Sequence, residues 1–316
     1  MKILIMGAGA IGSVFGGFLA ENGHDVSFIG RRPYIQAIKK DGLRISGIWG
    51  EHFVRNIKCF TSVQEISAAN FDLILLSTKS FDTEETVQQL LPLIGPATMI
   101  VSLQNGLGNI ETISRLAGKE RTIGARVIFG VVLLAPGHFN ITASADKVAL
   151  GAVSPDVPAE KVAQIAATIN DAGIATITTG EIEKFIWKKV LYNCCLNAPA
   201  ALLDSCYGKL GEFAATRNII HSIITEVLAV AKTCKIDLGF PDAAAYEKVL
   251  YEELLPPTYA HHPSTLQDLK NGKKTEIEAL NGAIVRLGRE KGIPTPVNWT
   301  LTQLIHGKEG IGPNPC

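Results

Sequence analysis

The N-terminal segment constrains the fold more than any other part of the chain. Residues 2–6 read KILIM, a short apolar run, and the glycine-rich turn GAGAIG follows at once at residues 7–12. A buried strand, then G-x-G-x-x-G, then a helix is the order found in dinucleotide-binding folds. The first glycine permits the tight turn, the second lets a pyrophosphate approach the backbone, and the third lets the helix pack closely. The pattern predicts a phosphate site at the start of a helix over residues 11–21.

The second predicted strand is Val26–Ile29, and the residues that follow it indicate which cofactor binds. NAD-binding versions of this fold usually place an acid there for the ribose 2′-hydroxyl, whereas this chain reads Arg31-Arg32. A guanidinium suits a 2′-phosphate because it offers a charge-assisted, bidentate fork. We therefore expect NADPH as the cofactor. The alternative is that both arginines are surface residues without a ligand.

Alternating strands and helices continue to about residue 180. Further strands are predicted at 71–79, 99–103, 122–134, 147–150 and 175–178, and a helix at 159–172. Lys79 and the turn Gln104–Gly108 each follow a buried strand, so both belong at the carboxyl edge of the sheet, where ligands of such sheets bind. The first half is thus expected to be an α/β, Rossmann-type, doubly wound sheet.

The pattern changes near residue 180 and becomes almost wholly helical. Helices are predicted at 181–203, 211–235, 241–254 and 273–291, with a capped helical turn at 264–268 and a loose tail from Gly307. A chain of 316 residues with 47% hydrophobic content supplies two cores. We expect two domains, residues 1–180 for the dinucleotide and residues 181–316 as an all-helical domain.

The segment Trp187–Asn197 in the first of these helices carries a polar stripe. Lys189, Asn193 and Asn197 recur every four residues and share one helix face, surrounded by apolar residues. A partly desolvated lysine can give up a proton near neutral pH, and a carboxamide can donate to a substrate oxygen. The stripe predicts a substrate site. The alternative is a solvated helix edge.

Charge and cysteine content narrow the class of partner. Thirty basic and thirty acidic residues give no net charge, which argues against nucleic acid or a membrane surface as the partner. No apolar run is long enough to span a bilayer. The six cysteines show no C-x-x-C pair and no metal-like clustering, so no metal is expected, and reduced thiols in the cytoplasm are the simplest interpretation; they are Cys59, Cys194, Cys195, Cys206, Cys234 and Cys316. Glu226 is either a paired, half-buried acid or a solvent-facing one, and the second is preferred.

Together these segments resemble the ketopantoate reductase (2-dehydropantoate 2-reductase) family over nearly the whole length. The resemblance lies in the glycine-rich turn, the Arg31 region and several further segments: Ser77-Thr78-Lys79, Gln104–Gly108, the Lys189, Asn193, Asn197 spacing, Ser264–Asp268 and Thr275–Gly282. It implies NADPH-dependent reduction of ketopantoate to pantoate, a step of pantothenate and coenzyme A biosynthesis. The small 2-oxo acid would then be the ligand, and a homodimer is one assembly that the family resemblance allows.

The resemblance also implies roles for single residues. Lys189 would protonate the nascent alkoxide, and Glu276 would position that lysine and the substrate. The implied substrate-binding residues are Asn105, Asn193, Asn197, Ser264 and His261. The implied cofactor-binding residues are Gly7, Ala8, Gly9, Ala10, Ile11, Gly12, Arg31, Lys79, Asn105 and Glu276.

Two departures from the family pattern concern the substrate. His261 stands where some members carry Asn, and Ala198-Pro199 replaces a common Pro-Leu-Thr. A paralogous reductase of another 2-oxo acid is therefore an alternative. A 3-hydroxyacid dehydrogenase relative is another, although the Gly-rich sequence before its lysine is absent here. A third is a non-catalytic NADPH-sensing protein.

Overall fold

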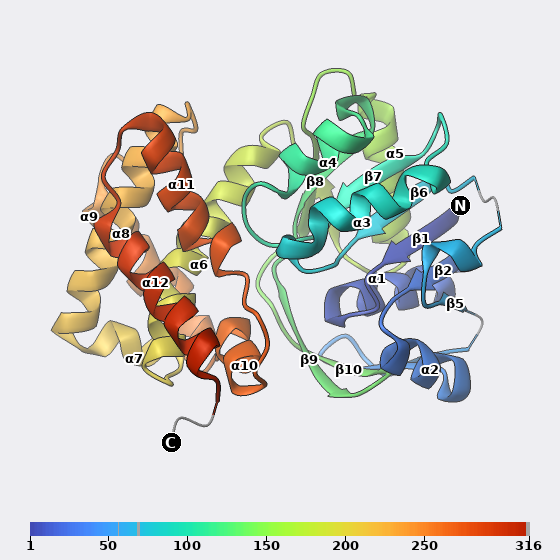
Figure 1. Cartoon of the computed structure of the whole chain (residues 1–316), viewed down its shortest axis with the longest axis horizontal. Helices are drawn as coiled ribbons and strands as arrows, with labels where there is room; N and C mark the ends of the chain where they lie inside the picture. The colour runs from blue at the N-terminus through green and yellow to red at the C-terminus, as the bar shows by residue number, and fades with distance from the viewer. Residues whose placement is uncertain (56, 68–69, 314–316) are drawn as a thin grey trace. The chain divides into compact units, whose positions relative to one another are not determined.

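The chain folds into two compact units in the computed structural model, which describes residues 1–55, 57–67 and 70–313 (Figure 1). The first unit comprises Met1–Gln104 and Asn109–Ile182, and the second comprises Asn105–Gly108 and Glu183–Cys316. The four residues Asn105–Gly108 therefore group with the second unit, although the strands on either side of them belong to the first.

An eight-stranded sheet in the order β12-β11-β8-β7-β6-β1-β2-β5 forms the centre of the first unit. Neighbouring strands run parallel, except that β8 and β11 are antiparallel. Its strands are β1 (Lys2–Met6), β2 (Asp25–Ile29), β5 (Lys58–Phe60), β6 (Leu73–Leu76), β7 (Met99–Ser102), β8 (Thr122–Arg126), β11 (Val148–Ala152) and β12 (Thr176–Thr178). The chain leaves β1 toward β2 on one side and later returns to pair β6 on its other side, which makes the carboxyl end of β1 the topological switch point.

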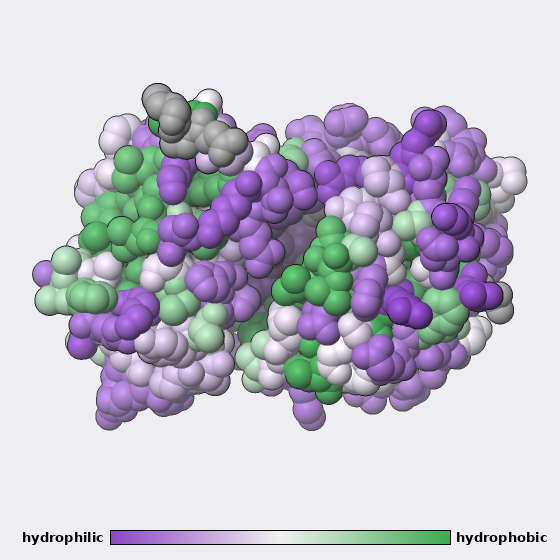
Figure 2. All heavy atoms as spheres, turned by 90° about the horizontal axis from the view of Figure 1, so that it is seen from below, coloured by the Kyte–Doolittle hydropathy of each residue, from purple (hydrophilic) through white to green (hydrophobic). Residues whose placement is uncertain are grey.

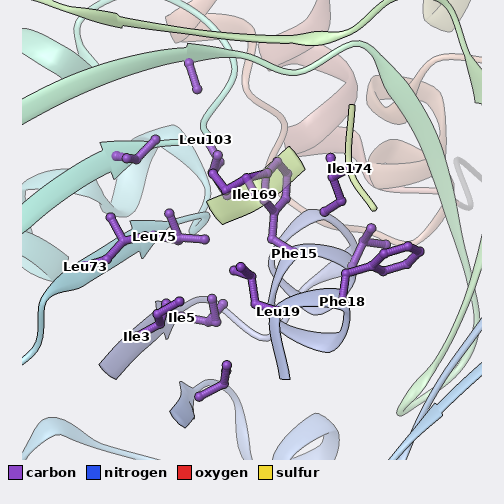
Figure 3. Packing of buried hydrophobic residues seen from close by; sticks show 14 of the residues in the cluster. Ile3, Ile5, Phe15, Phe18, Leu19, Leu73, Leu75, Leu103, Ile169 and Ile174 are labelled. Carbon is purple, nitrogen blue, oxygen red and sulfur yellow. The ribbon is translucent and has the colours of Figure 1, made fainter. Parts of the chain in front are cut away.

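Helices cover both faces of this sheet. Successive strand residues point to opposite faces, and because the residues on both faces are apolar, each face needs a covering layer. Ile3 and Ile5 join one core cluster with α1 (Ala10–Glu21) and α5 (Ala159–Asp171), whereas Leu4 joins a second cluster. Figure 3 shows the first cluster, with the labelled α1 residues beside those of the strands. The second cluster contains residues of α3 (Thr83–Leu90) and α4 (Asn109–Ala117). The predicted doubly wound sheet is confirmed.

The first unit contains further helical elements. They are α2 (Arg32–Asp41) and the 3₁₀ turns η1 (Val63–Glu65), η2 (Ser80–Asp82), η3 (Leu91–Leu93) and η4 (Lys119–Arg121).

A second, four-stranded sheet in the order β4-β3-β10-β9 was not predicted. It contains β3 (Leu43–Gly47), β4 (His52–Val54), β9 (Phe129–Ala135) and β10 (His138–Ser144). The single strand expected at 122–134 is wrong, because the run divides into β8 of the large sheet and β9 of the small one. A continuous β-prone run does not reveal where the chain changes its pairing partner.

The second unit is helical, as predicted. Its elements are α6 (Ile182–Leu202), α7 (Tyr207–Glu212), α8 (Ala214–Thr233), α9 (Ala243–Val249), the π-helical turn η5 (Leu250–Leu254), η6 (Pro256–Thr258), α10 (Ser264–Lys270), the 3₁₀ turn η7 (Ile277–Ala279), α11 (Asn281–Lys291) and α12 (Pro296–Ile311). One cluster of buried residues joins them.

Three predicted helix limits were wrong. The helix expected over 211–235 is interrupted at Phe213, whose backbone is extended. The helix expected over 273–291 begins only at Asn281, because a 3₁₀ turn precedes it. The expected loose tail is helical up to Ile311, and its last residues, 314–316, lie outside the described residues.

Glu226 is buried, so the preferred solvent-facing prediction was wrong. Its carboxylate accepts hydrogen bonds from the backbone N–H groups of Val297 and Asn298 at 2.8 and 2.9 Å, and from Asn298 Nδ2 at 2.7 Å. Asn298 Oδ1 in turn accepts from Asn281 Nδ2, which also donates to the Cys194 carbonyl. Glu226 therefore satisfies orphan N–H groups at the start of α12 from a different helix, a role that sequence spacing cannot show.

The surface combines hydrophilic and hydrophobic residues. Figure 2 shows patches of hydrophobic residues among hydrophilic ones on one face. Among the described residues, no helix is both long enough and apolar enough to cross a membrane.

Candidate functional site

The glycine-rich turn after β1 is close-packed at two of its glycines and open at the third. Gly7 has φ +116°, and a Cβ there would lie 2.8 Å from the Ser77 carbonyl carbon. A Cβ on Gly12 would lie 2.1 Å from the Gly7 oxygen, whereas a Cβ on Gly9 would meet no atom within 4 Å. The first and third glycines thus let the turn close on its neighbours, and the second leaves room for a ligand.

The start of α1 fits an anionic group. Its N-cap residue is Gly9, and no side chain caps the first turn. Ala10 and Ile11 are half-buried, and no acidic residue occupies this turn. The uncapped N–H groups and the positive end of the helix dipole suit the pyrophosphate of a dinucleotide, for which the glycine turn leaves space.

Three further predicted residues lie just beyond strand ends of the same sheet. Arg31 and Arg32 follow β2, and both are exposed. The Arg31 guanidinium lies 5.5 Å from the centre of the Tyr34 ring. Lys79 follows β6, is half-buried and precedes the turn η2. Because β1, β2 and β6 are parallel neighbours, their carboxyl ends bring these residues and the glycine turn to one edge of the first unit.

The polar stripe lies on α6, as the helical spacing predicts. Lys189 is half-buried, and Asn193 and Asn197 are 8% and 7% exposed. Lys189 Nζ donates to Asn105 Oδ1 at 2.5 Å. An exposed helix edge would leave the two amides in solvent, so their burial argues against that alternative.

The loop Asn105–Gly108 packs on the turn that follows Glu276. Leu107 N donates to the Ala279 carbonyl at 2.8 Å, and Gly106 has φ +88°. A Cβ on Gly106 would lie 2.3 Å from the same Ala279 oxygen, so only glycine allows this approach. Glu276 is half-buried and precedes η7 directly. Within the second unit the structure therefore connects Asn105 to Lys189 by a side-chain bond and to the Glu276 turn by backbone packing.

The opposite end of the stripe contacts an aromatic cluster. The Tyr207 hydroxyl donates to Asn197 Oδ1, and the Tyr207 ring centre lies 5.0 Å from that of His261. Burial, and secondarily the neighbouring charge of His262, lowers the pKa of His261. Ser264 is exposed at the first residue of α10, and no side chain caps that helix. Sequence reasoning missed Tyr207, since a tyrosine ten residues beyond Asn197 gives no periodic signal.

The cysteines beside the stripe are inert core residues. Cys194 and Cys195 are fully buried, and burial raises the pKa of both thiols far above the usual range. A thiol that keeps its proton is a poor nucleophile. Cys59, Cys206 and Cys234 are also free thiols, and Cys316 lies outside the described residues. In the described part of the chain, no cluster of three His, Cys, Asp or Glu side chains could hold a metal ion.

A glycine cradle at the switch point of a doubly wound sheet suits a dinucleotide, and an amine among amides on a helix suits a carbonyl substrate that accepts a hydride and a proton. They define the class of NAD(P)-dependent oxidoreductases. The family model described as "Ketopantoate reductase PanE/ApbA" matches residues 3–155, and its C-terminal counterpart matches residues 181–309. The chain belongs to the ketopantoate reductase family.

Individual relatives agree with this assignment. The chain is 41% identical to a 2-dehydropantoate 2-reductase of Aquifex aeolicus over 309 residues, which are 98% of this chain and 97% of the relative. A crystal structure of 2-dehydropantoate 2-reductase from Geobacter metallireducens is similar with a TM-score of 0.88 and 28% identity, covering 97% and 99% of the two chains. D-mandelate dehydrogenase, solved with NADH and anilino(oxo)acetate, is similar with a TM-score of 0.87 and 30% identity, covering 98% of each chain.

Proposed function

We propose that the protein reduces 2-dehydropantoate (ketopantoate) to pantoate with NADPH, a step of pantothenate and coenzyme A biosynthesis in the cytoplasm. The observation that carries the proposal is the position of the Lys189 amine on α6. It donates a hydrogen bond to Asn105, and the buried amides of Asn193 and Asn197 lie on the same helix face. The activity that names the Aquifex aeolicus relative supports the choice of substrate.

In this proposal residues 1–180 form the NADP-binding domain and residues 181–316 the catalytic domain. The glycine turn of residues 7–12 and the start of α1 hold the pyrophosphate, and Lys79, Asn105 and Glu276 contact the nicotinamide half. Arg31 binds the 2′-phosphate, because an exposed guanidinium stands at the end of β2 where an acid would favour NADH.

The chain's own residues perform the proton chemistry. Bound NADPH supplies the hydride. As negative charge develops on the carbonyl oxygen of the substrate, the Lys189 ammonium stabilises it and donates a proton. Asn105 and Glu276 orient Lys189, and the amides of Asn193 and Asn197, with Ser264 and His261, bind the oxygens of the 2-oxo acid.

Steady-state kinetics with two substrates and two cofactors test this proposal. Ketoisovalerate lacks the hydroxymethyl group of ketopantoate, so it leaves site amides unpaired; we expect its kcat/KM to be lower by about 10² or more. NADPH should be preferred over NADH. Equal rates with the two acids, or none with ketopantoate, would remove the named substrate while leaving the family assignment intact.

A second candidate is the reduction of an aromatic 2-oxo acid. It is favoured by the aromatic cluster of Tyr192, Tyr207 and His261 at the Asn197 end of the stripe, and by the similarity to D-mandelate dehydrogenase. Phenylglyoxylate, an aromatic 2-oxo acid, should be tested in the same assay. A kcat/KM for phenylglyoxylate above that for ketopantoate would favour this candidate.

A further inference from the structure

Tyr207 connects two of the candidate substrate-binding residues by three separate contacts. Its hydroxyl donates to Asn197 Oδ1. Its ring lies against the His261 imidazole, and its backbone N–H donates to the His261 carbonyl at 3.0 Å. Tyr207 is only 4% exposed, so these contacts are shielded from water.

The hydroxyl contact decides which end of the Asn197 amide can act on a ligand. Burial raises the pKa of Tyr207 well above its usual range, so the hydroxyl stays protonated, and in the structure it donates a hydrogen bond to Asn197 Oδ1. With Oδ1 occupied by that donor, Nδ2 is the group left to donate to an oxygen of the substrate. A rotated amide would instead present an acceptor, which a carbonyl or carboxylate cannot use.

The bond is not a general consequence of burying a tyrosine. In the same helical unit the hydroxyl of Tyr246 is also buried, yet it has no hydrogen-bond partner among the described residues. Tyr246 is 2% exposed and belongs to the same hydrophobic cluster as Tyr207. The two tyrosines thus form a matched pair that differs in the partner of the hydroxyl.

We propose that Tyr207 is a positioning residue, which fixes the Asn197 carboxamide as a hydrogen-bond donor to the 2-oxo acid and keeps His261 beside it. This role rests on the function proposed above. Tyr207 contacts Asn197, which lies about two helical turns from Lys189 on α6, so we expect the effect to fall on substrate binding and to leave the proton transfer unchanged.

The test compares Tyr207→Phe with Tyr246→Phe, each of which removes one hydroxyl and keeps the ring. For Tyr207→Phe we expect the KM of the 2-oxo acid to rise about 5- to 30-fold, the effect of one lost hydrogen bond. Its kcat and the KM of NADPH should stay within about twofold of wild type, as should all three constants of Tyr246→Phe. An unchanged substrate KM in Tyr207→Phe overturns the inference.

A double-mutant cycle separates positioning from simple packing. If Tyr207 acts through Asn197, then Tyr207→Phe should raise KM by less than about twofold in an Asn197→Ala background. Additive effects contradict the inference. Thermal unfolding of all variants checks that they remain folded.

The side-chain amide resonances of Asn197 provide a readout that does not depend on turnover. They should shift in Tyr207→Phe and stay in place in Tyr246→Phe, and unshifted resonances in Tyr207→Phe overturn the inference. Absence of ketopantoate turnover in the wild-type protein overturns the proposed function instead, so the two failures are distinguishable.

Discussion

Removal of the Glu226 carboxylate should destabilise the helical unit far more than removal of an exposed acid. In Glu226→Ala the backbone N–H groups of Val297 and Asn298 lose their acceptor inside the protein, and so does Asn298 Nδ2. Hydrogen bonds to a charged group contribute roughly 1.5–3 kcal/mol each, but three bonds that share one acceptor do not add. We expect a loss of about 3–5 kcal/mol, which is more than one such bond contributes and less than the sum of three.

Glu226→Gln serves as the graded variant, and Glu290→Ala as the control. Gln keeps one acceptor oxygen but turns an NH₂ group toward the N–H donors. The free energy of unfolding of Glu226→Gln should therefore fall by less, about 1–3 kcal/mol. Glu290 is an exposed residue of α11, and its removal should change the free energy of unfolding by less than about 0.5 kcal/mol.

Hydrogen exchange read by mass spectrometry locates the effect. Peptides from α12 should exchange about 10²-fold faster or more in Glu226→Ala, since each 1.4 kcal/mol is a tenfold change, whereas peptides from β1 and α1 should be unchanged. The reasoning would be refuted if the free energy of unfolding of Glu226→Ala lay within about 1 kcal/mol of the wild-type value and hydrogen exchange in α12 were unaltered.

Two further perturbations follow from the charged groups. Arg31→Ala should raise the KM of NADPH by about 10- to 150-fold, equivalent to roughly 1.5–3 kcal/mol, and should change NADH kinetics much less; equal changes for both cofactors would contradict a 2′-phosphate contact. His306 has a pKa raised above 6.5 by hydrogen bonds to Glu278 and then Glu309. The protonated imidazole therefore adds stability that is complete below about pH 6.5 and is lost as pH rises through the raised pKa. The melting temperature of His306→Gln should accordingly lie further below wild type at about pH 5.5 than at about pH 9, and a constant difference would count against the bridge.

Local signals were sufficient for the core of the fold. The strand at Lys2–Met6 and the helix predicted at 181–203 agree with β1 and with α6 within one residue at each end. Both have strong, self-contained patterns: an apolar run ending in glycines, and a helix with a polar stripe. The placement of Lys189, Asn193 and Asn197 on one face followed from spacing alone.

Features set by long-range contacts were not predictable from the sequence. The break between β8 and β9 depends on which strand each half pairs with, and the small sheet that receives β9 contains strands from far earlier in the chain. The burial of Glu226 depends on α12, about seventy residues later. The loop Asn105–Gly108 groups with the second unit, where Asn105 accepts a hydrogen bond from Lys189 and Leu107 donates one to Ala279. Each of these depends on a partner that no local window contains.

Single-turnover reduction of ketopantoate by Lys189→Ala, compared with Lys188→Ala, tests the central claim most directly. Lys188 is the exposed neighbour of Lys189 on α6, and its ammonium lies 5.3 Å from the centre of the Phe240 ring. Loss of the proton donor should slow reduction by about 10²- to 10⁴-fold in Lys189→Ala, with NADPH binding retained, whereas Lys188→Ala should stay within about twofold of wild type. Ordinary turnover by Lys189→Ala, or an equal loss in both variants, would contradict the assignment of Lys189 as the proton donor.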